Sequence, residues 1–138
     1  MAKKRSVAKP VLYQCASLGS LMGYGGKREW SWEKKLKKIR KVGFPGFVGR
    51  TTMVNEKQVV DSGLIFACTT DLGGIKEITP KLRNIKRHGA RVVNVQMLDH
   101  DTTTKRALEV ARRLMAMAAE LEMDVSIEVH RDTCTETP

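Results

Sequence analysis

Apolar and polar residues alternate along the chain in two different periods. Short apolar runs read as five strands, and segments with helical spacing lie between them as four helices. The expected strands are 11–17, 44–48, 64–69, 91–97 and 125–130, and the expected helices are 34–42, 55–62, 80–88 and 103–121. No hairpin turn separates consecutive strands. Strict alternation of strand and helix therefore predicts crossover connections and a parallel sheet.

The ends of the expected helices carry residues suited to helix termini. Gly43, Gly63 and Gly89 each follow a helix, where glycine takes the left-handed conformation without a steric penalty. Ser31 is a suitable cap for the first helix, and Asp101 or Thr102 for the last. Pro80, after Thr79, is expected at the first position of the third helix.

Two architectures accommodate five parallel strands and four helices. One is the leading part of an eight-stranded (βα)8 TIM barrel, and the alternative is a five-stranded, doubly wound sheet of the flavodoxin type. Only residues 131–138 follow the fifth strand, which is too few for a covering helix. We therefore expect the chain to be a partial barrel that stops within a repeating unit, with residues 1–10 as a basic tail and 11–138 as the N-terminal portion of the barrel domain.

The faces of the last two strands also favour a barrel. In 125–130, Val125, Ile127 and Val129 are expected on one face, and Ser126, Glu128 and His130 on the other. In 92–97, valine and methionine alternate with Asn94 and Gln96 in the same way. A parallel sheet covered on both sides is apolar on both faces, whereas a polar face that ends in charged groups is typical of the mouth of a barrel.

Composition and charge narrow the functional classes. At 138 residues and 41% hydrophobic residues, the chain fits one globular domain, and no apolar run is long enough to span a bilayer. Three widely spaced cysteines without CxxC spacing favour a reducing, cytoplasmic environment. The net charge of +10 raises the question of nucleic-acid binding, but no recognised binding motif accompanies it. A solvated helix face explains the cations concentrated at Lys34, Lys35, Lys37, Lys38, Arg40 and Lys41.

Candidate chemistry gathers at the end of the last two strands. Glu128, His130 and Arg131 place a carboxylate, an imidazole and a guanidinium where barrels and open α/β proteins bind ligands. Such groups can hold a divalent cation, move a proton or bind a phosphate. The alternative is that the glutamate and the arginine form an ion pair with a purely structural role. His100 follows the fourth strand and either lines the mouth or is an exposed loop residue. The glycines of 19–26 and 71–74 match no phosphate-binding motif and are expected to be flexible loops ahead of their helices.

Two stretches resemble a known superfamily. Asn94-Val-Gln-Met-Leu-Asp-His-Asp-Thr102 and Ile127-Glu-Val-His-Arg-Asp-Thr-Cys-Thr-Glu-Thr-Pro138 are similar to the xylose isomerase-like TIM-barrel superfamily, and most of all to its sugar phosphate isomerases and epimerases. The resemblance extends from Gln14 to Pro138. It implies metal-dependent proton transfer between adjacent carbons of a sugar or sugar phosphate. Val48 departs from it, because relatives often end the second strand with an acidic residue.

The resemblance also implies roles for individual residues. Glu128 would be the catalytic carboxylate and a ligand of a divalent metal ion (Mn, Mg, Co or Zn) in the complete protein, while His130, Arg131, His100 and Gln14 would contact the substrate. The other metal ligands of such enzymes lie on strands six to eight, so this chain alone is expected to be inactive. A homo-oligomer or a missing C-terminal half would then complete it. A nucleic-acid endonuclease of the same superfamily and a non-catalytic sugar-binding relative are the alternatives.

Overall fold

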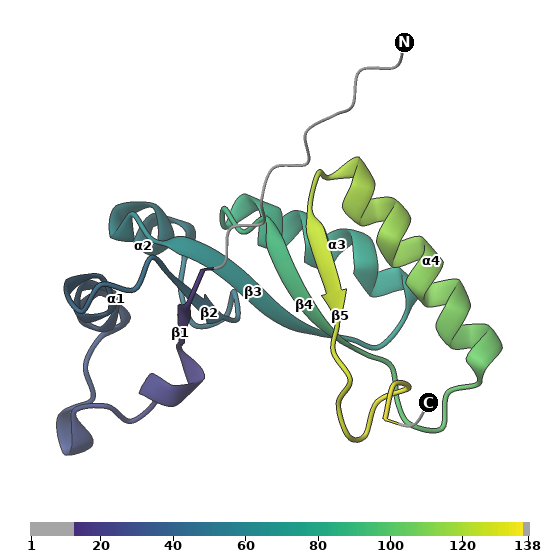
Figure 1. Ribbon diagram of the computed structural model, residues 1–138, viewed down its shortest axis with the longest axis horizontal. Coiled ribbons are helices and arrows are strands. Elements are labelled where there is room, and N and C mark those ends of the chain that lie inside the picture. The colour runs from purple at the N-terminus through teal and green to yellow at the C-terminus, as the bar shows by residue number, and fades with distance from the viewer. Residues whose placement is uncertain (1–12, 137–138) are drawn as a thin grey trace, which may run out of the picture.

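The computed structural model describes residues 13–136 and forms a sheet with helices alternating along the chain (Figure 1). The strands are β1 (Cys15–Ser17), β2 (Gly46–Gly49), β3 (Ile65–Leu72), β4 (Val92–Met97) and β5 (Asp124–Ile127). The helices are α1 (Trp32–Lys41), α2 (Glu56–Ser62), α3 (Ile75–Arg87) and α4 (Thr104–Glu120), with two short 3-10 turns, Gly19–Leu21 and Gly26–Arg28, after β1. The predicted alternation of five strands and four helices is confirmed.

The sheet is entirely parallel, and its strands follow one another in the order β1-β2-β3-β4-β5. The α/β class with parallel strands is therefore as expected. A doubly wound sheet of the flavodoxin type has the order 2-1-3-4-5, in which the winding direction reverses beside the first strand. This sheet has no such reversal among the described strands. Its strand order is the one found in the wall of a barrel.

All the buried strand side chains lie on one face of the sheet. Phe47 pairs in register with Phe66, Cys68 with Val93, and Leu72 with Met97, and each of these six side chains is at most 3% exposed. They form a single core with apolar side chains from all four helices, of which Leu36, Val59, Leu82 and Leu114 are examples. Phe47 and Phe66 stack with ring centroids 4.9 Å apart. The four helices therefore cover one face, and we call the other the uncovered face.

The start of α3 differs from the prediction. The helix begins at Ile75 with Gly74 as its N-cap, so Pro80 lies inside it and not at its first position. Because β3 continues to Leu72, the segment 71–74 is not a flexible loop ahead of the helix but strand and cap. The apolar stripe of Ile78, Leu82 and Ile85 is buried against the sheet, which stabilises the helix despite the interior proline.

The other predicted helix ends are largely confirmed. The hydroxyl of Ser31 accepts a hydrogen bond from the Lys34 amide, as expected for the cap of α1. The cap of α4 is Thr103, whose hydroxyl accepts from the Arg106 amide, and not Asp101 or Thr102. Gly43, Gly63 and Gly89 all have positive φ, which explains why glycine follows three of the helices.

Helix α1 corrects two details of its predicted amphipathic pattern. Lys35 is 2% exposed, so it does not belong to the solvated face with the other five cations. Its ammonium group pairs with Glu29 and lies 4.1 Å from the centre of the Trp32 ring. Val42, expected in the buried stripe, is the C-cap residue of α1 and is 56% exposed. The buried stripe of α1 therefore includes Lys35 beside Leu36 and Ile39.

The last strand is shorter than expected and ends at Ile127. Glu128 continues its register, since its amide donates to the Val95 carbonyl, but the next residues turn away from the sheet. Val129 is 78% exposed and does not share the face of Val125 and Ile127 as predicted. Residues 1–10, the expected basic tail, lie outside the described residues. None of the described helices has the length and apolar character needed to cross a membrane.

Candidate functional site at the carboxyl ends of the strands

Polar side chains occupy the carboxyl-terminal half of the uncovered face. Thr69, Asn94 and Ser126 lie side by side on β3, β4 and β5, and Asp71 and Gln96 form the next row. Toward the amino ends of β3 and β4 the face carries small or apolar residues, such as Ala67 and Val92, whereas β5 has Asp124 there. Residues two apart on a strand share a face, which is why these rows line up. The polar rows therefore lie where ligands bind in parallel α/β proteins.

Glu128 is held at this position by amide side chains. Its Oε2 atom accepts a hydrogen bond of 2.6 Å from the Asn94 side-chain nitrogen and one of 3.3 Å from Gln96. The Ser126 hydroxyl in turn donates to Asn94 Oδ1 at 2.8 Å. This chain of bonds fixes the amide orientation, because the oxygen of Asn94 faces Ser126 and its nitrogen faces the carboxylate. The second carboxylate oxygen, Oε1, has no hydrogen-bond partner among the described residues.

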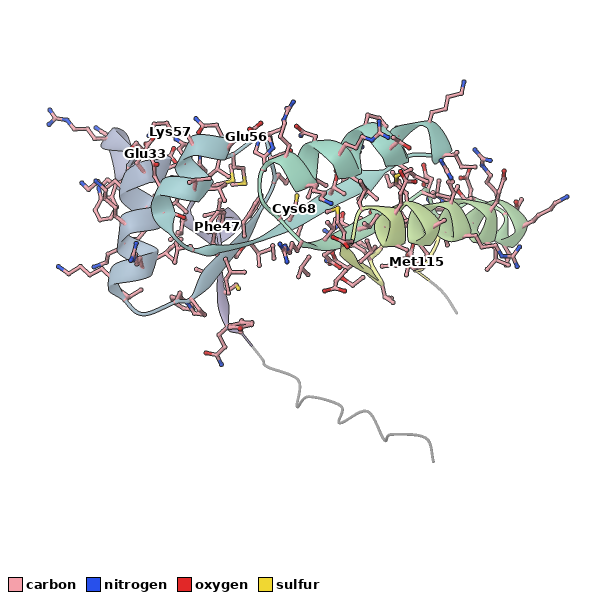
Figure 2. The ribbon with its side chains drawn as sticks, turned by 90° about the horizontal axis from the view of Figure 1, so that it is seen from above. Glu33, Phe47, Glu56, Lys57, Cys68 and Met115 are labelled. Carbon is pink, nitrogen blue, oxygen red and sulfur yellow. The ribbon has the colours of Figure 1, made fainter. Side chains whose placement is uncertain are left out.

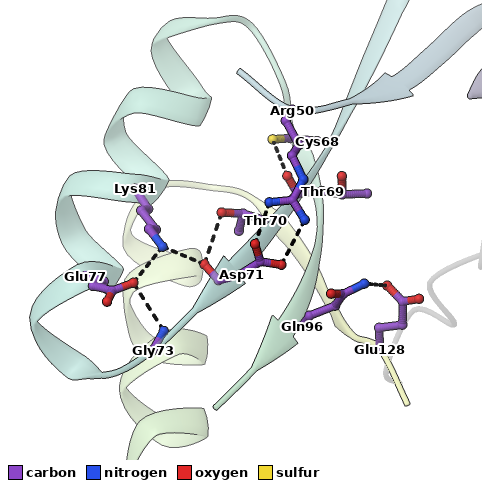
Figure 3. A network of polar contacts seen from close by, with 10 residues as sticks. All are labelled: Arg50, Cys68, Thr69, Thr70, Asp71, Gly73, Glu77, Lys81, Gln96 and Glu128. Carbon is purple, nitrogen blue, oxygen red and sulfur yellow. Dashed lines mark hydrogen bonds and ion pairs between the residues drawn. The ribbon is translucent and has the colours of Figure 1, made fainter. Parts of the chain in front are cut away.

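Arg50 and Asp71 form a second polar group beside the first (Figure 3). The guanidinium contacts both carboxylate oxygens, at 2.5 and 2.9 Å, in a bidentate pair between the loop after β2 and the end of β3. Hydrogen bonds from Arg50 hold the pKa of the Asp71 carboxyl below its usual value. Lys81 of α3 donates to the Asp71 backbone carbonyl at 2.8 Å and pairs with Glu77 at 2.6 Å.

A pocket of about 490 Å³ opens at the carboxyl ends of β3 and β4, beneath the loop that follows β5. Its lining consists of Asp71, Leu72, Gly73, Gln96, Leu98, Asp99, Thr102 and 130–133. Gln96 both lines this pocket and donates to Glu128, and so connects the pocket with the carboxylate. The volume is sufficient for a small metabolite.

The structure brings two of the predicted substrate contacts to this pocket. His130 and Arg131 both line it. The His130 Nδ1 atom lies 2.7 Å from the Arg131 carbonyl. A proton on Nδ1 would be donated to that carbonyl, so in the neutral ring the Nε2 atom keeps the free lone pair. Arg131 makes no ion pair within residues 13–136. Its guanidinium is available to an anionic ligand.

The other two predicted contacts lie elsewhere. His100 is exposed outside the pocket lining, with Nδ1 2.7 Å from Asp99 Oδ1, and this interaction raises the pKa of the imidazole. Gln14 is exposed at the amino end of the edge strand β1, four strands away from β5. Neither residue joins Glu128, His130 and Arg131 in one arrangement.

The described residues do not provide a metal site of the expected kind. Between positions 13 and 136 no three His, Cys, Asp or Glu side chains lie close enough together to share a cation. One oxygen of Glu128 accepts hydrogen bonds from two amide nitrogens, which do not ligate, and the Asp71 carboxylate is paired with Arg50. One carboxylate is too few, since divalent cations in proteins take several oxygen or nitrogen ligands.

The sequence interpretation did not single out Arg50 or Asp71 as site residues. Arg50 follows a strand that seemed to lack a charged end, and Asp71 was expected in a glycine-rich loop. The signal that could have found them is positional: a charged residue immediately after β2 and another near the end of the neighbouring parallel strand. Charged groups at such positions meet at one edge of the sheet.

Comparisons of the chain with protein-family models, with curated protein sequences and with solved structures give no match.

Proposed function

We propose that this chain forms the substrate-binding half of a sugar or sugar phosphate isomerase or epimerase site, with Glu128 as the proton-transferring carboxylate. The observation that carries the proposal is the position of Glu128, at the carboxyl end of a parallel strand and on the face that no helix covers. The resemblance of residues 94–102 and 127–138 to sugar phosphate isomerases and epimerases points to the same chemistry.

Glu128 is suited to proton transfer by its hydrogen bonds. Asn94 and Gln96 bind one carboxylate oxygen, so the carboxylate is oriented while Oε1 remains free to take or return a proton. In an isomerase or epimerase the proton is removed from the carbon next to a carbonyl group and returned to a neighbouring carbon or to the other face.

The segment after β5 would hold the anionic or polyhydroxylated part of the substrate. Arg131 supplies a planar donor for a phosphate, and His130 supplies Nε2 as a hydrogen-bonding group for hydroxyls. Asp71 and Asp99 also line the pocket, and their carboxylates suit sugar hydroxyls rather than phosphate. The phosphate is therefore expected nearest Arg131.

A second candidate is binding without turnover. It is favoured by the lack of a metal-ligand set among the described residues, because metal-assisted isomerisation needs a cation beside the substrate oxygens. In that case Glu128 would accept hydrogen bonds from sugar hydroxyls and take no proton.

The test follows exchange of carbon-bound hydrogen. Ribose 5-phosphate and fructose 6-phosphate are incubated with the chain in D2O, once in Mn²⁺-free buffer and once in buffer that contains Mg²⁺. Loss of the signal of the proton next to the carbonyl group is followed by NMR. Because the chain alone is expected to be inactive, exchange is measured at protein concentrations at which copies associate and can complete the site. Under those conditions we expect Glu128→Gln to lower the exchange rate by about 100-fold or more, the usual contribution of a general base. Glu120→Gln, on the exposed surface of α4, is the matched control and should exchange like the unaltered chain.

The outcomes separate the two candidates. Exchange that is lost in Glu128→Gln supports the isomerase or epimerase. Binding of the sugar phosphates with no exchange in any variant supports the sugar-binding alternative. Exchange at equal rates in the unaltered chain and Glu128→Gln, or the absence of any binding, contradicts the assignment of Glu128.

A further inference from the structure

The exposed apolar side chains of this molecule are not scattered over its surface. Among positions 13–136, eleven large apolar residues are exposed, and of these Val60 alone lies on one of the two inner helices, on α2. Ile65 and Val92 lie on the uncovered face, and the rest lie at the two ends of the sheet. Tyr13, Met22, Tyr24, Val42 and Phe44 are at the β1 end, and Leu108, Met115 and Val129 are at the β5 end. Apolar groups gathered in this way mark surfaces of association.

The β1 end carries an apolar groove along α1. This groove, of about 200 Å³, is lined by Ala16, Leu21, Tyr24, Trp30, Lys35, Lys38, Ile39, Val42 and Phe44. The ring of Trp30 meets Tyr24 edge-on at 5.0 Å, and the Lys34 ammonium lies 4.0 Å from its centre. The groove is on the flank of α1 that faces away from α2, because the opposite flank, with Leu36 and Arg40, faces α2.

The β5 end carries the matching ridge. Leu108 and Met115 are seven residues apart, so they lie on the same face of α4 two turns apart, and each is about half exposed. Met115 is on the side of α4 turned away from α3 (Figure 2). Beneath this ridge β5 has one neighbour, β4, so its other backbone edge is unpaired within residues 13–136. The same is true of β1, whose one neighbour is β2.

Several exposed side chains at the two ends carry opposite charges. Near the amino ends of the strands, Glu122 and Asp124 are exposed at the β5 end, and Lys38 and Lys41 are exposed at the β1 end. At the carboxyl ends, Asp132 and Glu136 follow β5, whereas Lys27 and Arg28 follow β1. None of these eight side chains takes part in an ion pair within the described chain. Residues of opposite charge therefore lie at the same level along the strand direction at the β1 end and at the β5 end of the sheet.

From the groove, the ridge, the free edges and the charges, we infer that the β5 end of one copy of this chain binds the β1 end of a second copy. Strand β5 of one copy would then pair in parallel with β1 of the next, and Leu108 and Met115 would enter the groove along α1. Inside the chain, contacts of α1 with α2 and of α3 with α4 likewise accompany the pairing of parallel strands. A contact between unlike surfaces of identical chains is heterologous and forms a ring or a growing chain.

Two single variants and a control test this inference by sedimentation velocity over a wide range of protein concentration. Met115→Glu places a charge on the ridge, and Val42→Glu places one in the groove. Each is expected to raise the dissociation constant of self-association at least ~10-fold, the usual effect of altering a central apolar contact. Val60→Glu introduces the same charge at an exposed valine on α2 and should change it less than ~2-fold. Because all three sites are exposed, each variant is expected to fold, which circular dichroism verifies.

Mixing the two variants distinguishes this interface from others. In a heterologous contact, the intact groove of Met115→Glu accepts the intact ridge of Val42→Glu, so the mixture should associate although each variant alone does not. If the β5 ends of two copies paired with each other, Met115→Glu would abolish association and Val42→Glu would not, and mixing the two variants would not restore it. That result would overturn the inference. A chain that remains monomeric at every concentration would overturn it too and would indicate that another polypeptide covers these ends.

Discussion

The two faces of the sheet differ in the burial and polarity of their side chains, although alternate residues of the same strands form both faces. On the covered face, Phe47, Val93 and Val95 have no exposed area and belong to one core with the helices. On the uncovered face, Val92 is 44% exposed, and the rows beyond it are polar and joined by hydrogen bonds. Side chains on the first face are therefore constrained by packing, and those on the second face are free to meet a ligand or a partner.

The largest expected difference between the two faces is in the reactivity of their cysteine thiols. Cys68 lies on the covered face at 1% exposure, and burial raises the pKa of its thiol to about 11. Cys15 lies on the uncovered face and is half-buried, so burial raises its pKa less. Only the thiolate reacts, and at pH 8 a group with a pKa of about 11 is about one part in a thousand thiolate. We expect maleimide to label Cys15 at least ~100-fold faster than Cys68 in single-cysteine variants.

The labelling rates also check the assignment of faces. Raising the pH toward 11 should accelerate Cys68 more than Cys15, because the Cys68 thiol is the one still protonated. Unfolding in urea should bring the two rates together. Equal rates in the native chain would mean that the helices do not cover this face as described.

The second contrast compares neighbouring valines on β4. Val93→Ala removes two methyl groups from a fully buried site, which costs about 2–3 kcal/mol of the free energy of unfolding once the cavity is included. Val92→Ala makes the same chemical change on the uncovered face and should cost about 0.5 kcal/mol or less in the monomer. Urea unfolding at low protein concentration measures both. A cost at Val92 equal to that at Val93 would show that the uncovered face is buried in solution.

The smallest contrast concerns the Arg50–Asp71 pair. Both side chains are about half exposed, so solvent screening limits the loss in Asp71→Asn to about 0.5 kcal/mol. The pKa of Asp71 is lowered in the folded chain, so its stabilisation is present above the ordinary aspartate pKa and is lost as the pH falls through the lowered value. Unfolding of the variant and the unaltered chain should differ at pH 7 and converge in acid. A difference that grows in acid would contradict the pairing.

The alternation of apolar and polar residues predicted the covered face well, because buried positions of a strand are apolar and recur at every second residue. Val93, Val95 and Met97 alternate with polar residues, and the structure places them as that alternation requires. The polar site was predicted only where a single strand displays it, at Glu128, His130 and Arg131. The pairing of Arg50 with Asp71 depends on two strands meeting, which no local pattern encodes.

The misplaced elements have physical reasons as well. Pro80 predicts a helix start because proline favours the first turn. The apolar stripe of α3 begins earlier, however, and its burial outweighs one lost hydrogen bond. Lys35 is expected in water because lysine is seldom buried, but its burial depends on contacts with Glu29 and Trp32 that form only in the folded chain. Such tertiary contacts are not visible in the spacing of residues along the chain.

The most direct test of a functional uncovered face is an NMR titration with ribose 5-phosphate. Shift changes should concentrate at Gln96, Glu128 and 130–133, and should be absent at the buried positions Phe47, Val93 and Leu114. Arg131→Met should weaken binding, whereas Arg113→Met on the surface of α4 should not. Shift changes spread over the basic outer surfaces of the helices, or equal weakening by both substitutions, would contradict a sugar phosphate site at the carboxyl ends of these strands.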